Sequence, residues 1–92
     1  MDFSSEGEYI KPAHVLLQDL EGEAVLLNLN NGQYYGLDEV GNRMFQLITS
    51  ANCLAAVYQT LLQEYKIEPD QLKTDLAAFL DHLLENGLVA RV

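Results

Sequence analysis

The side chains of this sequence that most often carry catalysis are one cysteine and two histidines. In an enzyme, Cys53 would be the nucleophile and His14 or His82 the base that activates it. None of the three lies in a recognisable catalytic motif, and the apolar residues that follow Cys53 indicate a packing role in a helix. Two isolated histidines without a third ligand are weak evidence for a metal site. We therefore expect a protein with no catalytic residues, no metal and no cofactor.

The charged residues indicate which partners the protein does not bind. Fourteen Asp and Glu residues outnumber five Lys and Arg residues, which gives a formal net charge of −9 at pH 7. The basic residues are scattered along the chain: Lys11, Arg43, Lys66, Lys73 and Arg91. A phosphate backbone or an anionic membrane surface is repelled by such a chain. We expect no nucleic acid and no membrane among its partners.

One domain accounts for the 92 residues. Residues 1–13 are polar and acidic and are expected to form a flexible segment, followed by a folded domain over residues 14–92. No apolar run approaches the roughly 20 residues that span a bilayer, and the N-terminus is acidic where a secretion signal is basic. A single cysteine cannot form an internal disulfide. We expect a cytoplasmic protein.

Three strands are predicted in the first half of the domain. The apolar runs HVLLQDL and EAVLLNL are separated by Glu21 and Gly22, which suits a hairpin. The sequence NNG then supplies residues that tolerate positive φ, so QYYGL is expected to return as a third antiparallel strand.

The second predicted strand has two different faces, because successive side chains of a strand point in opposite directions. One face is fully apolar and the other is mixed: Val25, Leu27 and Leu29 form the first, and Ala24, Leu26 and Asn28 the second. We expect helices to cover the fully apolar face.

Three helices follow the strands. Asp38 is the expected N-cap of the first helix, which runs to about Thr49. The second begins near Asn52, and the third has Pro69 in its first turn and ends at Gly87. This order predicts an α+β fold, in which a three-stranded antiparallel sheet is followed by three helices packed on one of its faces.

The third strand is expected to lie at an edge of the sheet, because consecutive strands usually pair as neighbours. Its sequence QYYGL has no Lys or Pro to protect that edge, although Gly36 would permit a bulge. Two explanations stay open. Either the fold covers the edge, with the C-terminal segment LVARV or a dimer mate, or a partner peptide completes it by strand addition.

A family resemblance favours strand addition. The succession VLLNLNNGQYYGLDEVGNRMFQLI, two amphipathic helices and the ending FLDHLLENGLV resemble the PqqD-like family over about residues 14–90. Proteins of this family resemble winged helix-turn-helix domains and are precursor recognition elements for ribosomally made, post-translationally modified peptides. The resemblance implies that a leader peptide binds along the third strand, beside the third helix, and is handed to a modifying enzyme or leader peptidase. The small size and the ending GLV most resemble the stand-alone recognition proteins of lasso-peptide clusters.

On this resemblance, the ligand-binding residues come from two elements. The strand contributes Gln33, Tyr34, Tyr35, Gly36 and Leu37, and the third helix contributes Lys73, Asp75, Leu76, Phe79 and Leu83. By strand alternation, Tyr35 and Leu37 are expected on one side and Tyr34 on the other, with one set in the core and the other accessible. The helical spacing of the leucines and Phe79 is also typical of core residues, so which of them line the cleft stays open.

Three other functions are alternatives. A peptide chaperone for a radical enzyme, as in pyrroloquinoline quinone synthesis, is the alternative pathway. A winged-helix transcription regulator is disfavoured because the third helix carries four acidic residues and one lysine, namely Asp70, Asp75, Asp81, Glu85 and Lys73. A self-pairing acidic adaptor would join two copies through their edge strands, whereas the peptide binder is expected to be a monomer or a weak dimer.

Overall fold

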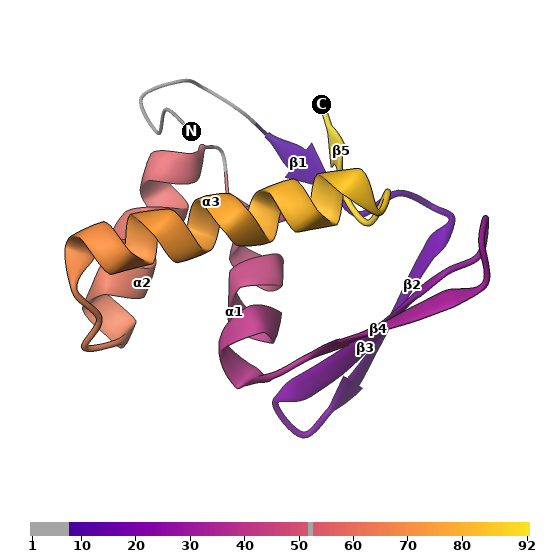
Figure 1. Ribbon diagram of the computed structural model, residues 1–92, viewed down its shortest axis with the longest axis horizontal. Helices are drawn as coiled ribbons and strands as arrows, with labels where there is room; N and C mark the ends of the chain where they lie inside the picture. Colours follow the sequence, from indigo (N-terminus) through magenta and orange to yellow (C-terminus); the bar gives the residue numbers. More distant parts are fainter. Residues whose placement is uncertain (1–7, 52) are drawn as a thin grey trace.

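The computed structural model describes residues 8–51 and 53–92, and its elements follow the predicted order (Figure 1). The sheet has the strand order β2-β3-β4, all antiparallel. Its strands are β2 (Val15–Leu20), β3 (Glu23–Asn28) and β4 (Gln33–Leu37). The helices are α1 (Glu39–Ile48), α2 (Leu54–Glu64) and α3 (Pro69–Glu85). This is the predicted α+β fold. Within the described ranges, no helix is long and apolar enough to cross a membrane.

Two tight turns set the register of the sheet. Glu21 and Gly22 have φ values of 55° and 98°, as the two central residues of a type I′ hairpin turn require. Gly32, in the turn between β3 and β4, has a φ of 71°. In the resulting register, residues of the three strands lie directly opposite one another. Leu16, for example, is opposite Leu27, which is opposite Tyr34.

The helices cover the mixed face of the sheet, so the expectation that they cover the fully apolar face was wrong. Ala24, Leu26 and Asn28 are at most 4% exposed, whereas Leu29 is 55% exposed. The amide Nδ2 of Asn28 donates to the carbonyl of Asn86 at 2.9 Å, and its Oδ1 accepts a backbone N–H two residues further on. Because these hydrogen bonds satisfy the buried amide, its desolvation is compensated. The fully apolar face is left open to solvent.

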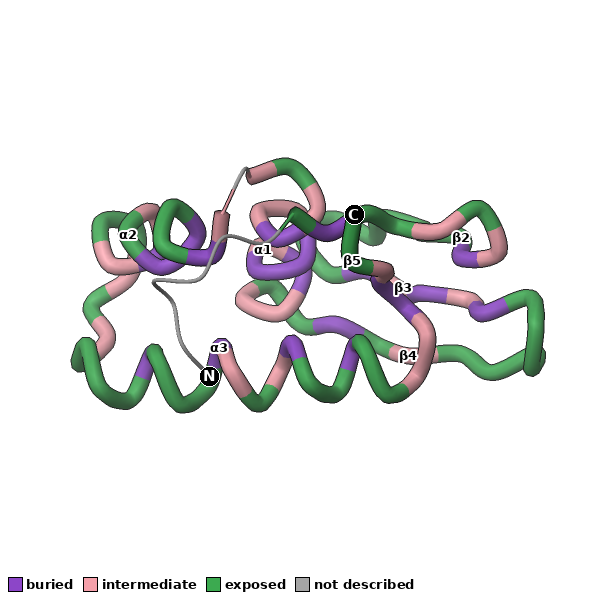
Figure 2. Tube along the Cα trace, turned by 90° about the horizontal axis from the view of Figure 1, so that it is seen from above, coloured by how far each residue is buried: buried purple, intermediate pink, exposed green. Residues whose placement is uncertain are grey.

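The core lies between the covered face of the sheet and the three helices. In Figure 2, the buried positions of α3 recur on the side of the helix that is turned toward the other elements. The largest fully buried side chains come from β2, β3, all three helices and the segment after α3, and include Leu26, Phe45, Leu61, Leu76 and Leu88. Burying each such side chain contributes about 1.5–3 kcal/mol.

Local signals fix the ends of the first and third helices. Asp38 Oδ1 accepts a hydrogen bond from the N–H of Gly41 at 2.7 Å, which confirms the predicted N-cap of α1. Pro69 is the first residue of α3, where its missing N–H costs no hydrogen bond. Gly87 follows the C-cap of α3 with a φ of 67°, the left-handed conformation expected there.

The predicted N-cap of the second helix, Asn52, lies outside the described residues. Cys53 occupies the N-cap position of α2 and has no side-chain capping hydrogen bond.

The two ends of the described chain pair with each other. β1 (Tyr9–Ile10) runs antiparallel to β5 (Ala90–Arg91), and the N–H of Val92 donates to the carbonyl of Glu8 at 2.8 Å. Residues 1–13 were expected to be flexible. Residues 1–7 lie outside the described part, but Tyr9 is buried in the core. The C-terminal segment is extended, as expected, and its partner is β1.

Candidate functional site

In the described part of the chain, β4 forms an edge of the sheet. It pairs with β3 on one side only, and the C-terminal strand does not cover its other side, because β5 pairs with β1. Gln33, Tyr34 and Gly36 are exposed, and the strand carries no Lys or Pro. Outward backbone N–H and C=O groups of such a strand are available to another extended chain.

A groove of about 360 Å³ lies beside this edge, between β4, α1 and α3. In Figure 2, β4 is the strand of the sheet nearest to α3. The groove combines an apolar surface with two carboxylates, and its lining consists of Gly36, Leu37, Asp38, Val40, Gly41, Met44, Asp75 and Phe79.

Four of the ten residues predicted for the site line this groove. Gly36 and Leu37 come from the edge strand, and Asp75 and Phe79 from α3, one turn apart. Asp75 is exposed, and its Oδ1 accepts a hydrogen bond from Gln71 Nε2 at 2.8 Å. Phe79 is half-buried, so its ring packs against the core and also borders the groove.

The other three predicted residues of α3 lie elsewhere. Leu76 and Leu83 are fully buried and therefore support the groove from within the core. The Lys73 ammonium lies 5.4 Å from the centroid of the Tyr58 ring on α2, a cation–π contact away from the groove lining.

The two tyrosines of β4 point to opposite faces, as predicted. Tyr34 is 71% exposed on the open face of the sheet. Tyr35 is half-buried on the helix side, where its hydroxyl donates to Asn86 Oδ1 at 3.3 Å. Its ring also meets His82 edge to face, with centroids 6.3 Å apart. Tyr35 therefore connects the edge strand β4 to the C-terminal end of α3.

Sequence reasoning assigned no binding role to the part of the groove that α1 and its cap contribute. Val40 and Met44 lie one turn apart in the sequence, the spacing of an apolar helix face, and Asp38 is the predicted cap of that helix. Nothing in this spacing distinguishes a residue that lines a groove from one that is wholly in the core. One feature of the sequence indicates this part of the groove. Only Asp38 separates the edge strand from the helix, so the first turn of α1 must lie next to β4.

The groove lining carries Asp38 and Asp75 and no basic side chain. Away from this lining, an ion pair joins α1 to α2, in which Arg43 Nη2 and Glu64 Oε2 are 2.6 Å apart. The hydrogen bond from Arg43 lowers the pKa of the Glu64 carboxyl and raises that of the guanidinium. A ligand in the groove therefore meets apolar surface and negative charge.

The cysteine and the two histidines lie in separate parts of the fold, just before β2, on α3 and at the N-cap of α2. His14 Nε2 is 3.0 Å from the carbonyl oxygen of Gly87, His82 contacts Tyr35, and Cys53 is the N-cap of α2. In the part of the chain that the structure describes, no three His, Cys, Asp or Glu side chains gather where they would hold a metal ion.

Known proteins match this chain in family and in fold. A family model described as Coenzyme PQQ synthesis protein D (PqqD) matches residues 23–89. No curated protein sequence matches the chain. A solved structure of TbiB1 in complex with the TbiA(beta) leader peptide is 29% identical, with a TM-score of 0.80, over 87% of this chain and 93% of that one. A structure of lasso peptide synthetase B1 complexed with the leader peptide is 26% identical, with a TM-score of 0.81. The match covers 90% of this chain and 98% of that one.

Proposed function

This chain belongs to the PqqD family, and from that membership we propose that it is a non-catalytic recognition element for the leader segment of a ribosomally made, post-translationally modified precursor peptide. The leader adds as a fourth strand along β4 and places alternate side chains in the groove beside α1 and α3. The observation that carries this proposal is the unpaired side of β4, which runs along the groove.

The chemistry of the site suits an extended peptide. Strand addition satisfies backbone groups whatever the peptide sequence, so selectivity comes from the side chains that enter the groove. Phe79 and Met44 offer apolar surface to such a side chain, and Asp75 offers an acceptor to a basic one. The leader peptides bound to TbiB1 and to lasso peptide synthetase B1, two proteins similar over nearly the whole chain, support the same ligand class here.

Lasso-peptide synthesis is the pathway that these likenesses favour, because one of the similar proteins is a lasso peptide synthetase subunit. In that pathway the domain presents the precursor to a separate leader peptidase or modifying enzyme. The name of the family model supports the alternative, a chaperone for the radical enzyme of pyrroloquinoline quinone synthesis. The neighbouring genes distinguish the two pathways, since a short precursor gene next to a peptidase gene indicates lasso-peptide synthesis.

The leader must order when it binds, and this costs several kcal/mol of the contact energy. We therefore expect a Kd of about 1 μM or somewhat tighter, equivalent to about −8 to −10 kcal/mol.

The test uses a fluorescein-labelled synthetic leader of the precursor encoded beside the gene, titrated with the wild-type protein and two variants in fluorescence anisotropy. Phe79→Ala removes apolar surface from the groove and is expected to weaken binding about tenfold or more. Leu84→Ala, on the same helix, 40% exposed and outside the groove lining, is the matched control and is expected to bind within about twofold of wild type.

Hydrogen exchange of the same complex tests the mode of binding. Strand addition slows exchange of outward-pointing amides in β4 and leaves those of β2, the opposite edge, unchanged. Leader binding that is equally tight in folded Phe79→Ala, or that leaves β4 exchange unchanged, contradicts the proposed site.

A further inference from the structure

The alternation of hydrogen bonds in the sheet determines which backbone groups of β4 face its free edge. The N–H of Leu29 donates to the carbonyl of His14 at 2.8 Å, so the odd-numbered residues of β3 bond to β2 and the even-numbered ones bond to β4. The partners of these even-numbered residues on β4 are Gln33, Tyr35 and Leu37. The N–H and C=O groups of Tyr34 and Gly36 therefore point outward, toward an added strand.

Gly36 has no side chain at this edge, and the fold itself does not require a glycine there. Its φ is not positive, in contrast to that of Gly32 in the turn before β4. A Cβ built on Gly36 meets no atom within 4 Å, so a residue that favours strands fits the same position. A glycine inside a strand lowers its stability and often marks the close approach of a ligand or another backbone.

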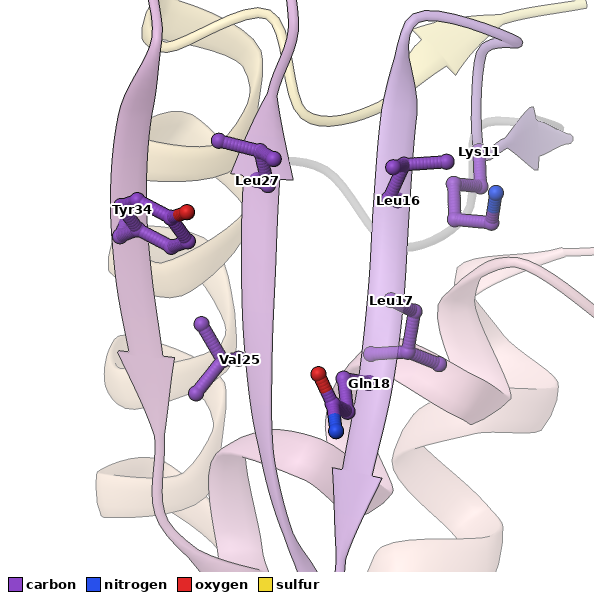
Figure 3. Close-up of a pocket in the computed structure, with 7 residues that line it drawn as sticks. All are labelled: Lys11, Leu16, Leu17, Gln18, Val25, Leu27 and Tyr34. Atoms are coloured by element: carbon purple, nitrogen blue, oxygen red, sulfur yellow. The ribbon is translucent and has the colours of Figure 1, made fainter.

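Gly36 lines a hollow of about 310 Å³ at the end of the sheet. It lies opposite Val25, and both Val25 and Tyr34 are on the open face of the sheet, which is turned away from the helices (Figure 3). Apolar side chains of the lining include Leu20, Val25 and Leu37, and the carboxylates are those of Glu23 and Asp38. The groove beside α3 also reaches Gly36, so this residue borders both spaces.

We propose that Gly36 selects the leader by the size of one side chain. The leader residue that pairs with Gly36 carries a large, non-acidic side chain, which lies across β4 over the glycine and fills the hollow. The inference rests on the proposed function, because it requires a leader strand added to β4.

The geometry of an antiparallel pair brings this side chain to the hollow. The two residues of a hydrogen-bonded pair have Cα atoms about 5.5 Å apart, and their side chains project from the same face. Neighbouring strands lie about 4.8 Å apart, so a side chain about 5 Å long or longer crosses β4 and reaches the hollow beside Val25. Aromatic residues cover edge glycines in this way, whereas Ala and Ser are too short.

The charges of the lining exclude an acidic side chain. Glu23 and Asp38 border the hollow, and the whole chain has a net charge of −9. A leader carboxylate placed between them is repelled, whereas a basic side chain lays its apolar stem on Val25 and directs its charge to these carboxylates. Large apolar and long basic residues are therefore the favoured occupants.

A double-mutant cycle tests the selection. Synthetic leaders in which each large residue is replaced in turn by Ala are titrated in fluorescence anisotropy against the wild-type protein and Gly36→Val. The valine occupies the hollow, so Gly36→Val is expected to bind the parent leader about tenfold or more weakly. One Ala leader is expected to lose about tenfold with the wild-type protein and to lose nothing further with Gly36→Val.

The thermal stability of the free protein separates this role from a structural one. Because the fold does not need the glycine, Gly36→Val is expected to raise Tm by about 3 °C or more while it weakens leader binding. Gly36→Ala, a smaller step, is expected to change both quantities in the same directions. Gln18→Val is the matched control, since Gln18 is in the same row as Val25 and Gly36 but on β2, the opposite edge, and its leader affinity is expected to stay within about twofold of wild type.

The outcomes distinguish this inference from the proposed function. Leader binding by Gly36→Val that is as tight as wild type, with the β4 amides still protected from exchange, overturns the inference and leaves the proposed function standing. A lower Tm in both Gly36 variants, or a cycle in which no leader position is coupled to Gly36, also overturns it. A wild-type protein that binds no leader overturns the proposed function, and this inference with it.

Discussion

Asn28 is a single buried polar residue on the face of the sheet that the helices cover. It is 4% exposed, and its two hydrogen bonds connect β3 to the end of α3 and to the following turn. The sequence pattern predicted that the face without an asparagine would be the buried one. That prediction failed because the partner of Asn28, the carbonyl of Asn86, lies 58 residues away, where local periodicity carries no information about it.

Asn28→Ala is therefore expected to destabilise the protein. It leaves the carbonyl of Asn86 and the N–H of Asn30 without their partner, which costs about 2 kcal/mol. For a domain of this size, that corresponds to a decrease in Tm of about 10 °C, measured by circular dichroism. Asn31→Ala is the control, because Asn31 also accepts a backbone hydrogen bond, from Gln33, but is exposed. Equal decreases in the two variants would show that burial of Asn28 does not matter.

At the scale of elements, the features that depend on neighbouring residues were predicted and those that depend on distant ones were not. The Glu21–Gly22 turn and the caps at Asp38 and Gly87 follow from local backbone chemistry, and all three are confirmed. The short strands β1 and β5 escaped prediction as a pair, because two residues carry no periodicity and their partners are at opposite ends of the chain.

The candidate site divides in the same way. Strand order alone predicted that β4 would be an edge, and alternation separated Tyr34 from Tyr35. The helix side depended on the rotation of α3 about its axis. Helical spacing does not specify this rotation finely enough to separate Asp75, which lines the groove, from Lys73, which contacts α2.

The Arg43–Glu64 ion pair gives the joint between α1 and α2 a pH dependence. Its hydrogen bond lowers the pKa of Glu64 in the folded state, so its stabilisation is present above the ordinary carboxyl pKa of about 4.3 and is lost as pH falls through the lowered value. Glu64→Gln is expected to lower Tm slightly at pH 7 and not at about pH 2. Both groups are solvent-exposed, so 1 M NaCl is expected to reduce the difference at pH 7 as well. A difference in Tm that persists unchanged at low pH contradicts this role.

For the molecule as a whole, the open edge of the sheet at β4 implies that the free energy of unfolding depends on the bound leader. If the leader binds only the folded state, a free concentration about 100 times Kd stabilises the fold by about 2.7 kcal/mol. For 92 residues this corresponds to a rise in Tm of about 10 °C or more, which differential scanning fluorimetry or circular dichroism measures. A scrambled peptide of the same composition, and therefore the same charge, is the control and is expected to leave Tm unchanged. A leader that binds in anisotropy but raises Tm no more than the scrambled peptide would mean that it binds the unfolded chain equally well, which is incompatible with recognition by an edge that exists only in the folded sheet.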